Sequence, residues 1–314
     1  MTSSNVQLER FTVPSTDGKT QISAGYMRPS GAAKAVLQIA HGMQEHISRY
    51  EDFAAFLAER GFVVAGNDHL GHGESINSPD DLGYFGEGAS NLVVGDMHQL
   101  RKAMQAKYPG LPYFMLGHSM GSFMLRKYLA LNGKGLAGAI VMGTGFTPAG
   151  TTKAGLAVIN GLSRVRGERH KSQFVANLAF GKDYKPYDMT GTEPERSWLS
   201  HNVENVKAYY ADPLCGFPFT LNGYRGLMEA VQFSCAQENV NAIPVNLPIL
   251  LVSGALDPVG GAGAGVRKVH DMMSIAGIRD LELKLYPGML HEILNEPDHD
   301  VVYADLEAWM EARL

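Results

Sequence analysis

The chain has 314 residues, a hydrophobic content of 45% and a formal net charge of −5, so it can bury a large core and has no excess of positive charge to favour nucleic acid. No run of about 18 apolar residues occurs and the first ten residues contain no apolar segment, which argues against a spanning helix and a signal peptide and predicts a cytoplasmic protein. The two cysteines, Cys215 and Cys235, are too few for a disulfide framework and form no Cys/His metal motif.

Strands and helices alternate along the first half of the chain. The segments 6–13 and 21–28 flank the turn Ser15-Thr-Asp-Gly18 and predict a β-hairpin. Short continuous apolar runs predict buried strands, whereas apolar residues at helical spacing predict helices. These patterns give strands at 35–40, 62–66, 113–116 and 139–142, and helices around 50–57, 91–107 and 123–131.

The alternation stops between residues 147 and 237. This stretch contains only helical fragments separated by Gly and Pro, at 152–165, 173–180, 194–209 and 221–236. The alternation resumes with strands at 248–253 and 281–286 and helices at 265–275 and 301–310. An insertion without strands in a parallel sheet predicts a helical cap. We therefore predict an α/β protein whose core (1–146 and 238–314) has a mostly parallel sheet flanked by helices, with a cap (147–237) inserted after the sixth strand.

The sequence Gly117-His-Ser119-Met-Gly121 lies between a predicted strand and a predicted helix. G-x-S-x-G at such a junction is typical of a sharp turn that raises a serine above the sheet edge, with glycines where side chains would collide with the adjacent strand and helix. The pentapeptide alone also fits an ordinary glycine-rich turn. The elements on either side of it favour Ser119 as a nucleophile.

A serine hydroxyl needs a base to accept its proton, so Ser119 requires a histidine and an orienting carboxylate from elsewhere in the chain. In open α/β sheets such groups follow the carboxyl ends of strands. Asp257 follows the predicted strand 248–253, and His291 follows the strand 281–286. Of the other histidines, His118 lies beside the nucleophile. The rest of those considered lie in the loop described next (His41 and His46) or in the cap and on exposed helices (His170, His201, His270 and His299). The predicted catalytic residues are therefore Ser119, Asp257 and His291.

The tetrahedral intermediate of acyl transfer needs backbone N–H groups directed at its oxygen. In this arrangement one comes from the residue after the nucleophile and one from the loop after the third strand. These residues are Met120 and Met43. The turn His41-Gly-Met43 also fits a simple strand-ending turn.

Over nearly its whole length the chain resembles the α/β-hydrolase-fold serine hydrolases that include monoacylglycerol lipases and lysophospholipase-like proteins. The resemblance implies the same triad, the same oxyanion donors, and a place for Glu45 and Arg49 near the substrate head group. Leu294 stands where the animal monoacylglycerol lipases have a second histidine. The motifs that carry the resemblance are His41-Gly-Met-Gln-Glu-His46 with Arg49-Tyr50, Asn67-Asp-His-Leu-Gly-His-Gly-Glu-Ser75, Gly117-His-Ser-Met-Gly121, Asp212-Pro-Leu-Cys-Gly-Phe217, Leu256-Asp-Pro258 and His291-Glu-Ile-Leu-Asn-Glu296.

Two features of the predicted cap each have two interpretations. The basic run 163–171 fits transient contact with a membrane surface or anionic head group, and it also fits a solvated helix end. Leu156 and Ile159, with Val158 and Leu162, fit the wall of an acyl tunnel or the packing face of the cap.

We predict a carboxylic ester hydrolase without metal or cofactor that acts on single-chain acyl lipids such as monoacylglycerols through an acyl-enzyme. Lysophospholipase action, acyl transfer, peptidase action and a non-catalytic binding role are the alternatives. No nucleic-acid partner is expected, and the oligomeric state stays open. Because the predicted triad and oxyanion loop lie outside residues 147–237, we expect removal of this segment to spare short esters and to abolish acyl-chain preference.

Overall fold

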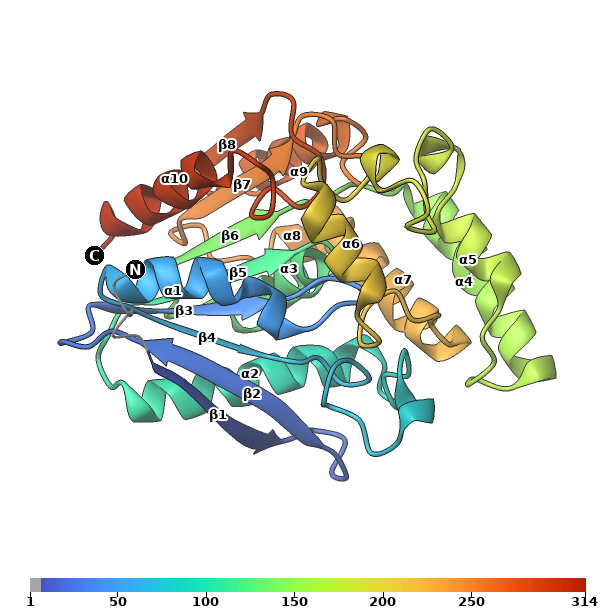
Figure 1. Cartoon of the computed structure of the whole chain (residues 1–314), viewed down its shortest axis with the longest axis horizontal. Helices are drawn as coiled ribbons and strands as arrows, with labels where there is room; N and C mark the ends of the chain where they lie inside the picture. Colours follow the sequence, from blue (N-terminus) through green and yellow to red (C-terminus); the bar gives the residue numbers. More distant parts are fainter. Residues whose placement is uncertain (1–6) are drawn as a thin grey trace.

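An eight-stranded sheet forms the centre of the computed structural model, which describes residues 7–314. The strand order is β1-β2-β4-β3-β5-β6-β7-β8; β1 pairs with β2 and β2 with β4 in antiparallel fashion, and the remaining pairs are parallel (Figure 1). The predicted, mostly parallel sheet is confirmed. The strands are β1 (Gln7–Pro14), β2 (Gln21–Arg28), β3 (Ala35–Ala40), β4 (Phe62–Asn67), β5 (Tyr113–His118), β6 (Gly138–Met142), β7 (Ile249–Gly254) and β8 (Leu281–Tyr286).

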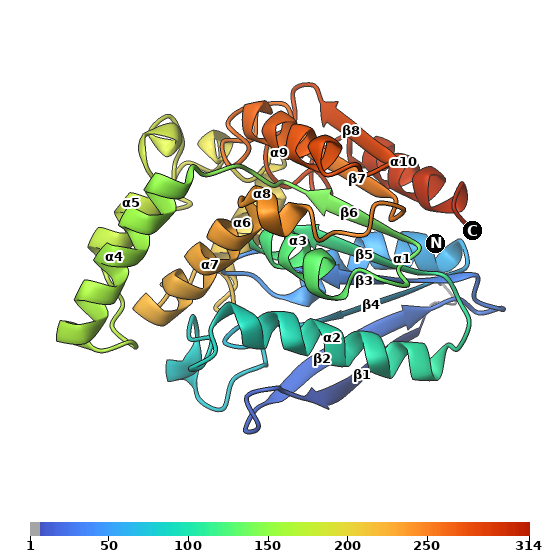
Figure 2. The same cartoon turned by 180° about the vertical axis from the view of Figure 1, so that it is seen from behind.

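Helices cover both faces of the sheet. One face packs against α1 (Glu51–Glu59) and α10 (His299–Glu311). The other packs against α2 (Ser90–Lys107), α3 (Met120–Asn132) and α9 (Ala264–Ile275), which Figure 2 shows in front of the sheet. Every residue of the central strands β3 to β7 is buried, which explains why these strands appear in the sequence as continuous apolar runs. None of the helices within residues 7–314 is long and apolar enough to cross a membrane.

The segment between β6 and β7 is built from helices, and Figure 1 places it at the end of the sheet toward which the parallel strands point. The prediction of one helix over residues 194–209 is wrong. A short 3-10 turn at Pro194–Arg196 is followed by an irregular stretch. The helix α6 starts only after Asn202, whose side chain accepts a hydrogen bond from Asn205 N. The helices of this segment are α4 (Ala149–Arg166), α5 (Gln173–Ala179), α6 (Val203–Ala211), α7 (Leu221–Ser234) and α8 (Gln237–Val240), with a further 3-10 turn at Lys182–Tyr184. Elsewhere in the chain, 3-10 turns lie at Ile47–Tyr50 and Pro79–Asp81.

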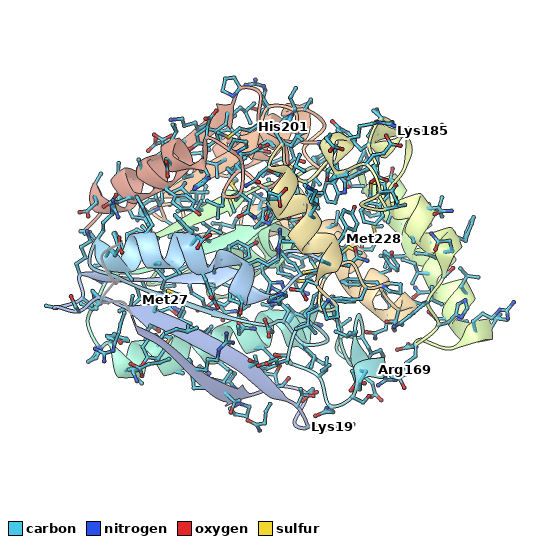
Figure 3. All side chains as sticks on the ribbon, in the orientation of Figure 1. Lys19, Met27, Arg169, Lys185, His201 and Met228 are labelled. Carbon is cyan, nitrogen blue, oxygen red and sulfur yellow. The ribbon has the colours of Figure 1, made fainter. Side chains whose placement is uncertain are left out.

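The predicted cap is joined closely to the rest of the molecule through α7. Tyr224, Ala230 and Val231 of α7 belong to the same buried cluster as α2 and α3, and α4 packs on the outer side of α7. In Figure 3 Arg169 and Lys185 mark opposite ends of the cap. The division into a core and a cap at residues 147 and 237 stays a prediction.

Candidate active site

Ser119 lies on a sharp turn between β5 and α3. Its φ of 53° and ψ of −121° are rare for a residue with a side chain. A Cβ atom at Gly121 would lie 2.1 Å from the carbonyl oxygen of Ala40, and one at Gly117 would lie 2.4 Å from the carbonyl oxygen of Gly121. The two glycines thus allow the helix to start against β3 and β5 directly behind Ser119.

Asp257 and His291 follow the neighbouring parallel strands β7 and β8 and lie together. His291 Nδ1 is 2.9 Å from Asp257 Oδ2, and both residues are buried. Asp257 also accepts hydrogen bonds from Ser253 Oγ (3.0 Å) and Val259 N (2.9 Å). Burial opposes ionisation, but the charge of His291 and these hydrogen bonds lower the pKa of Asp257. Burial opposes protonation of His291, but the Asp257 carboxylate raises the pKa of His291 above its ordinary value.

The predicted oxyanion loop follows β3 and passes next to Ser119. A Cβ atom at Gly42 would lie 3.1 Å from Ser119 Cβ. Gly42 N donates to Glu45 Oε1, and Gln44 N donates to His72 Nε2 at 3.4 Å. Within the part of the chain that the structure describes, the Met43 amide between them has no protein acceptor. Met120 is the first residue of α3, where a helix leaves the N–H without an intrahelical partner.

A buried ionic network connects the oxyanion loop with the residue after His291. Arg49 donates from Nη1 to Glu45 Oε2 and from both Nη1 and Nη2 to Glu292, each at 2.7 Å. Asn205 of α6 donates to Glu292 Oε2 at 2.7 Å, and Tyr50 OH donates to Glu45 Oε1 at 2.8 Å. Burial favours the neutral acids, yet Arg49 lowers the pKa of Glu292 below its ordinary value, and a hydrogen bond from His118 together with the charge of Arg49 lowers that of Glu45.

Glu45 and Arg49 border the cavity described next, but they are bonded to each other and to Glu292. Their predicted place near a substrate head group therefore stays a prediction. Sequence reasoning missed the roles of Glu292 and Asn205 in this network; the position of Glu292 beside His291 was the available signal.

Three buried histidines pack beneath the oxyanion loop. The rings of His41 and His69 have centroids 4.1 Å apart, and those of His41 and His72 lie 5.2 Å apart. His41 Nε2 accepts a hydrogen bond from the amide of His69 at 2.9 Å. Burial, with smaller contributions from neighbouring histidines, lowers the pKa of His41 and of His72 to about 3, so these rings are neutral at pH 7.

A cavity of about 490 Å³ lies between the cap and the loops that carry the predicted catalytic residues, and it is bordered by Ser119, His291, Met43 and Met120. Leu156 and Ile159, the predicted substrate contacts, do not line it, because α4 packs outside α7 and Ile159 is buried in the main core. Met228, which is labelled in Figure 3, belongs to α7 and borders the cavity. The apolar wall is formed instead by Phe123, Phe146, Leu178, Phe180, Trp198, Leu227, Met228 and Val231.

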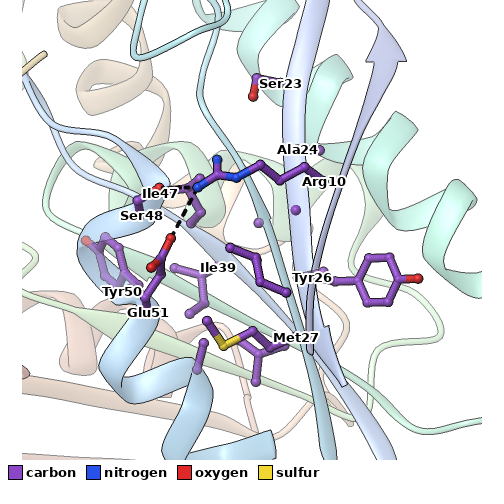
Figure 4. Close-up of a pocket in the computed structure, with 16 residues that line it drawn as sticks. Arg10, Ser23, Ala24, Tyr26, Met27, Ile39, Ile47, Ser48, Tyr50 and Glu51 are labelled. Atoms are coloured by element: carbon purple, nitrogen blue, oxygen red, sulfur yellow. Dashed lines mark hydrogen bonds and ion pairs between the residues drawn. The ribbon is translucent and has the colours of Figure 1, made fainter. Parts of the chain in front are cut away.

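A second hollow lies between β2 and the start of α1 (Figure 4). Its volume is about 40 Å³, which is room for a few water molecules. Arg10 donates to Ser48 and Glu51 at its rim, both at 3.4 Å. None of the predicted catalytic residues borders it.

One group of side chains in the described part of the chain has the spacing of metal ligands. Donor atoms of His46, Asp212 and Cys215 lie within 4.8 Å of one another. His46 Nε2 and Asp212 Oδ2 are already hydrogen-bonded at 2.9 Å, which joins the oxyanion loop to the cap without an ion.

Comparison with known proteins shows the family to which this chain belongs. A family model described as serine aminopeptidase, S33, matches residues 31–298. The chain belongs to this family. The human (Homo sapiens) monoglyceride lipase is 28% identical over 296 residues, covering 92% of this chain and 86% of the human protein. The monoacylglycerol lipase of Mycolicibacterium smegmatis is 28% identical over 301 residues, covering 95% of both chains.

Solved structures agree with the fold of this S33-family chain. A thermostable carboxyl esterase from Bacillus coagulans, in complex with glycerol, has a TM-score of 0.89 and 30% identity, covering 97% of this chain and 98% of the esterase. A lipase in an open form has a TM-score of 0.88 and 26% identity, covering 98% of this chain and 99% of the lipase. The predicted α/β-hydrolase fold is confirmed, and the chain is a serine ester hydrolase.

Proposed function

We propose that the protein hydrolyses monoacylglycerols and related single-chain acyl esters, with Ser119 as nucleophile, His291 as base and Asp257 as the group that orients His291. The observation that carries this proposal is that Ser119 and His291 border one cavity with an apolar wall, and that His291 is bonded on its far side to the buried Asp257. The monoacylglycerol preference is supported by the similarity to monoglyceride lipases and to an esterase in complex with glycerol.

In this mechanism Ser119 Oγ attacks the ester carbonyl while His291 Nε2 accepts its proton. The oxyanion is stabilised by the amides of Met43 and Met120. The intermediate collapses when His291 returns the proton to the leaving alcohol oxygen, which releases glycerol and leaves the acyl group on Ser119. A water molecule repeats the sequence and releases the fatty acid. Asp257 stabilises the imidazolium that forms twice in each cycle.

The acyl chain would lie against the apolar residues contributed by α5 and α7 and by the loop after β6. Phe146, Leu178 and Met228 are examples from each of these three segments. Burying a methylene group is worth about 0.8 kcal/mol, so an apolar wall of this kind favours longer chains until the cavity is filled. The alcohol part would lie on the side of Glu45 and Arg49.

We also propose transient contact of the cap with a membrane surface. Val165 (81% exposed) and Phe174 (60%) are apolar side chains on α4 and α5 that face solvent. The exposed Arg164 and Arg166 lie beside Val165. This combination suits an interface with acidic lipids. Co-sedimentation with anionic vesicles should fall when Phe174 is replaced by Asp; equal binding of both proteins would refute the contact.

Peptidase action is a second candidate because of the description of the family. An aminopeptidase must bind the positive amino terminus of its substrate with a carboxylate. Of the carboxylates that border the cavity, Glu45 and Glu292 are bonded to Arg49 and Asp183 is exposed. This arrangement favours an uncharged ester substrate.

The proposal is tested by comparing kcat/KM for a monoacylglycerol, a lysophospholipid, p-nitrophenyl acetate and an aminoacyl p-nitroanilide, with Ser119→Ala as the blank. We expect the monoacylglycerol to exceed the lysophospholipid and the anilide by at least about tenfold, which is about 1.4 kcal/mol of transition-state binding. Preference for the lysophospholipid or the anilide would contradict the proposed substrate. Glycerol in the assay, followed by product analysis, separates hydrolysis from acyl transfer.

A further inference from the structure

Two aromatic rings pack against the imidazole of His291. The indole of Trp198 has its centroid 4.9 Å from that of His291, with 31° between the planes. The imidazole of His118 lies 4.6 Å away at 39°. No ring contact joins Trp198 to His118 in the described residues, so the two rings approach His291 from different sides. His118 comes from β5, whereas Trp198 comes from the cap.

Trp198 is itself fixed by aromatic neighbours in the cap. Tyr184 meets its ring edge-to-face at a centroid distance of 5.2 Å, and Phe180 packs at 6.1 Å. Phe180 and Tyr184 also pack against each other at 5.3 Å. The indole that faces His291 is therefore one member of a packed group.

Hydrogen bonds join the segment that follows Trp198 to the segment around His291. Glu292 N donates to the carbonyl oxygen of Leu199 at 2.7 Å. The buried carboxylate of Glu296 accepts from Leu290 N at 2.7 Å and from His201 N at 3.0 Å. Glu292, which follows His291, is thus bonded directly to Leu199. Leu290, which precedes His291, is joined to His201 through the Glu296 carboxylate. Figure 3 labels His201 in this junction.

We propose that Trp198 is a positioning residue for His291, so that the cap supports the catalytic base as well as binding the acyl chain. This inference rests on the proposed function of His291. The stacked indole restricts rotation of the imidazole, and its π-face favours the imidazolium that forms when Ser119 is deprotonated. The other charged or titratable groups that face His291 are Asp257, Glu292, Glu45 and His118.

Trp198 also borders the cavity, so contact with the acyl chain is the competing explanation. The two explanations differ in what they change. An acyl-wall residue alters KM for long esters and leaves the pH profile of a short ester unchanged. A residue that positions His291 alters kcat for p-nitrophenyl acetate and also the pH at which ionisation of His291 limits the rate.

The test uses p-nitrophenyl acetate with Trp198→Leu, Trp198→Phe and the control Tyr210→Leu. Tyr210 packs in the same small cap cluster as Trp198 but does not border the cavity. We expect Trp198→Leu to lower kcat about tenfold and to shift the acid limb of kcat/KM down by about half a pH unit, because the imidazolium loses its aromatic face. Trp198→Phe should stay within about threefold of the parent, and Tyr210→Leu should keep the parent's pH profile.

If folded Trp198→Leu kept the parent's kcat and the parent's acid limb in the pH profile of kcat/KM, the proposal would be overturned. If Ser119→Ala retains activity, the proposed function fails instead, so the two failures can be distinguished. If Trp198→Leu does not fold, NMR of His291 decides the matter: the stacked indole should shift the Hε1 resonance upfield, and Trp198→Phe should reduce this shift. An Hε1 resonance at the position of an exposed histidine would overturn the inference.

Discussion

The strained backbone of Ser119 is held in place by its neighbours. A residue in a sparsely populated region of φ and ψ costs on the order of 1–3 kcal/mol, and it persists only where the surrounding structure requires it. Gly117 and Gly121 allow β3 and α3 to approach so closely that the chain has no room for a relaxed turn. The same glycines place the amide of Met120 at the start of α3, beside Ser119.

At the same scale we predict that Asp257→Asn lowers kcat by about 10⁴ and leaves the protein folded. The amide side chain would no longer enforce the tautomer of His291 in which Nε2 faces Ser119. The measurement is kcat for p-nitrophenyl acetate, with circular dichroism to confirm folding. If the variant were nearly as active as the parent, another carboxylate would have to orient His291.

The proximity of Asp257 and His291 could be predicted because each follows a strand that the apolar pattern reveals, and parallel strands end at one edge of the sheet. Trp198 and Asn205 could not be predicted in this way. They lie in the cap, where no strand periodicity fixes their position, and their partners are far away in the sequence. Leu156 and Ile159 have the apolar spacing of a tunnel wall, but α4 packs against α7, and Ile159 belongs to the main buried cluster rather than to the cavity wall.

The elements around the oxyanion loop depend on neutral histidines. His41, His69 and His72 fill the space between the ends of β3 and β4 and the aromatic residues Phe85, Phe217 and Phe219. His72 accepts from Gln44 N, and His41 accepts from His69 N. Protonation of either ring would replace an acceptor by a donor in a site without water access.

We predict that this cluster makes the protein sensitive to acid. The pKa of His72 is about 3 in the folded state, whereas an exposed histidine titrates near 6.5. Below about pH 6.5 the unfolded state therefore binds a proton that the folded state does not, and the free energy of unfolding falls by about 1.4 kcal/mol per pH unit for each such histidine. The stabilisation is fully present above about pH 6.5 and is lost as the pH falls toward 3.

Urea unfolding of the parent and of His72→Gln at pH 7 and pH 5 measures this effect. The glutamine oxygen can replace the acceptor for Gln44 N but does not titrate. We expect the variant to lose about 2 kcal/mol less stability between the two pH values. Equal losses would mean that His72 is not buried in its neutral form.

The bounds of β2, β3 and β8 agree with the prediction to the residue, because glycine, proline or polar turns flank each of these strands. The cap was harder to predict. Its chain between Arg196 and Val203 is irregular because Ser200 and His201 bond to Glu296 rather than continue a helix. Such long-range partners leave no periodic signal in the sequence.

At the scale of the whole molecule, the cap is bonded to and packed against the loop that carries His291. The sequence predicts that removal of residues 147–237 spares short esters, because the predicted triad lies outside that segment. The structure argues for a different outcome, because the cap supplies Trp198 and the hydrogen-bond partners of the loop that carries His291, and α7 is part of the main core. Deletion of residues 147–237 should therefore reduce the hydrolysis of p-nitrophenyl acetate as well.

Acyl-chain preference is better tested with one residue of α7. We predict that Met228→Glu lowers kcat/KM for a decanoate ester at least about tenfold more than for acetate, since each buried methylene contributes about 0.8 kcal/mol. Val158→Glu is the matched control, because Val158 lies on α4, is 36% exposed and does not border the cavity. An unchanged chain-length profile in Met228→Glu would place the acyl chain elsewhere.

The central claim is that Ser119 is the nucleophile, and labelling with a fluorophosphonate followed by peptide mass mapping tests it most directly. We predict a single adduct on Ser119 in the parent, no adduct in Ser119→Ala, and loss of esterase activity by several orders of magnitude in that variant. An adduct on another residue, or retained ester hydrolysis by a folded Ser119→Ala protein, would contradict the claim.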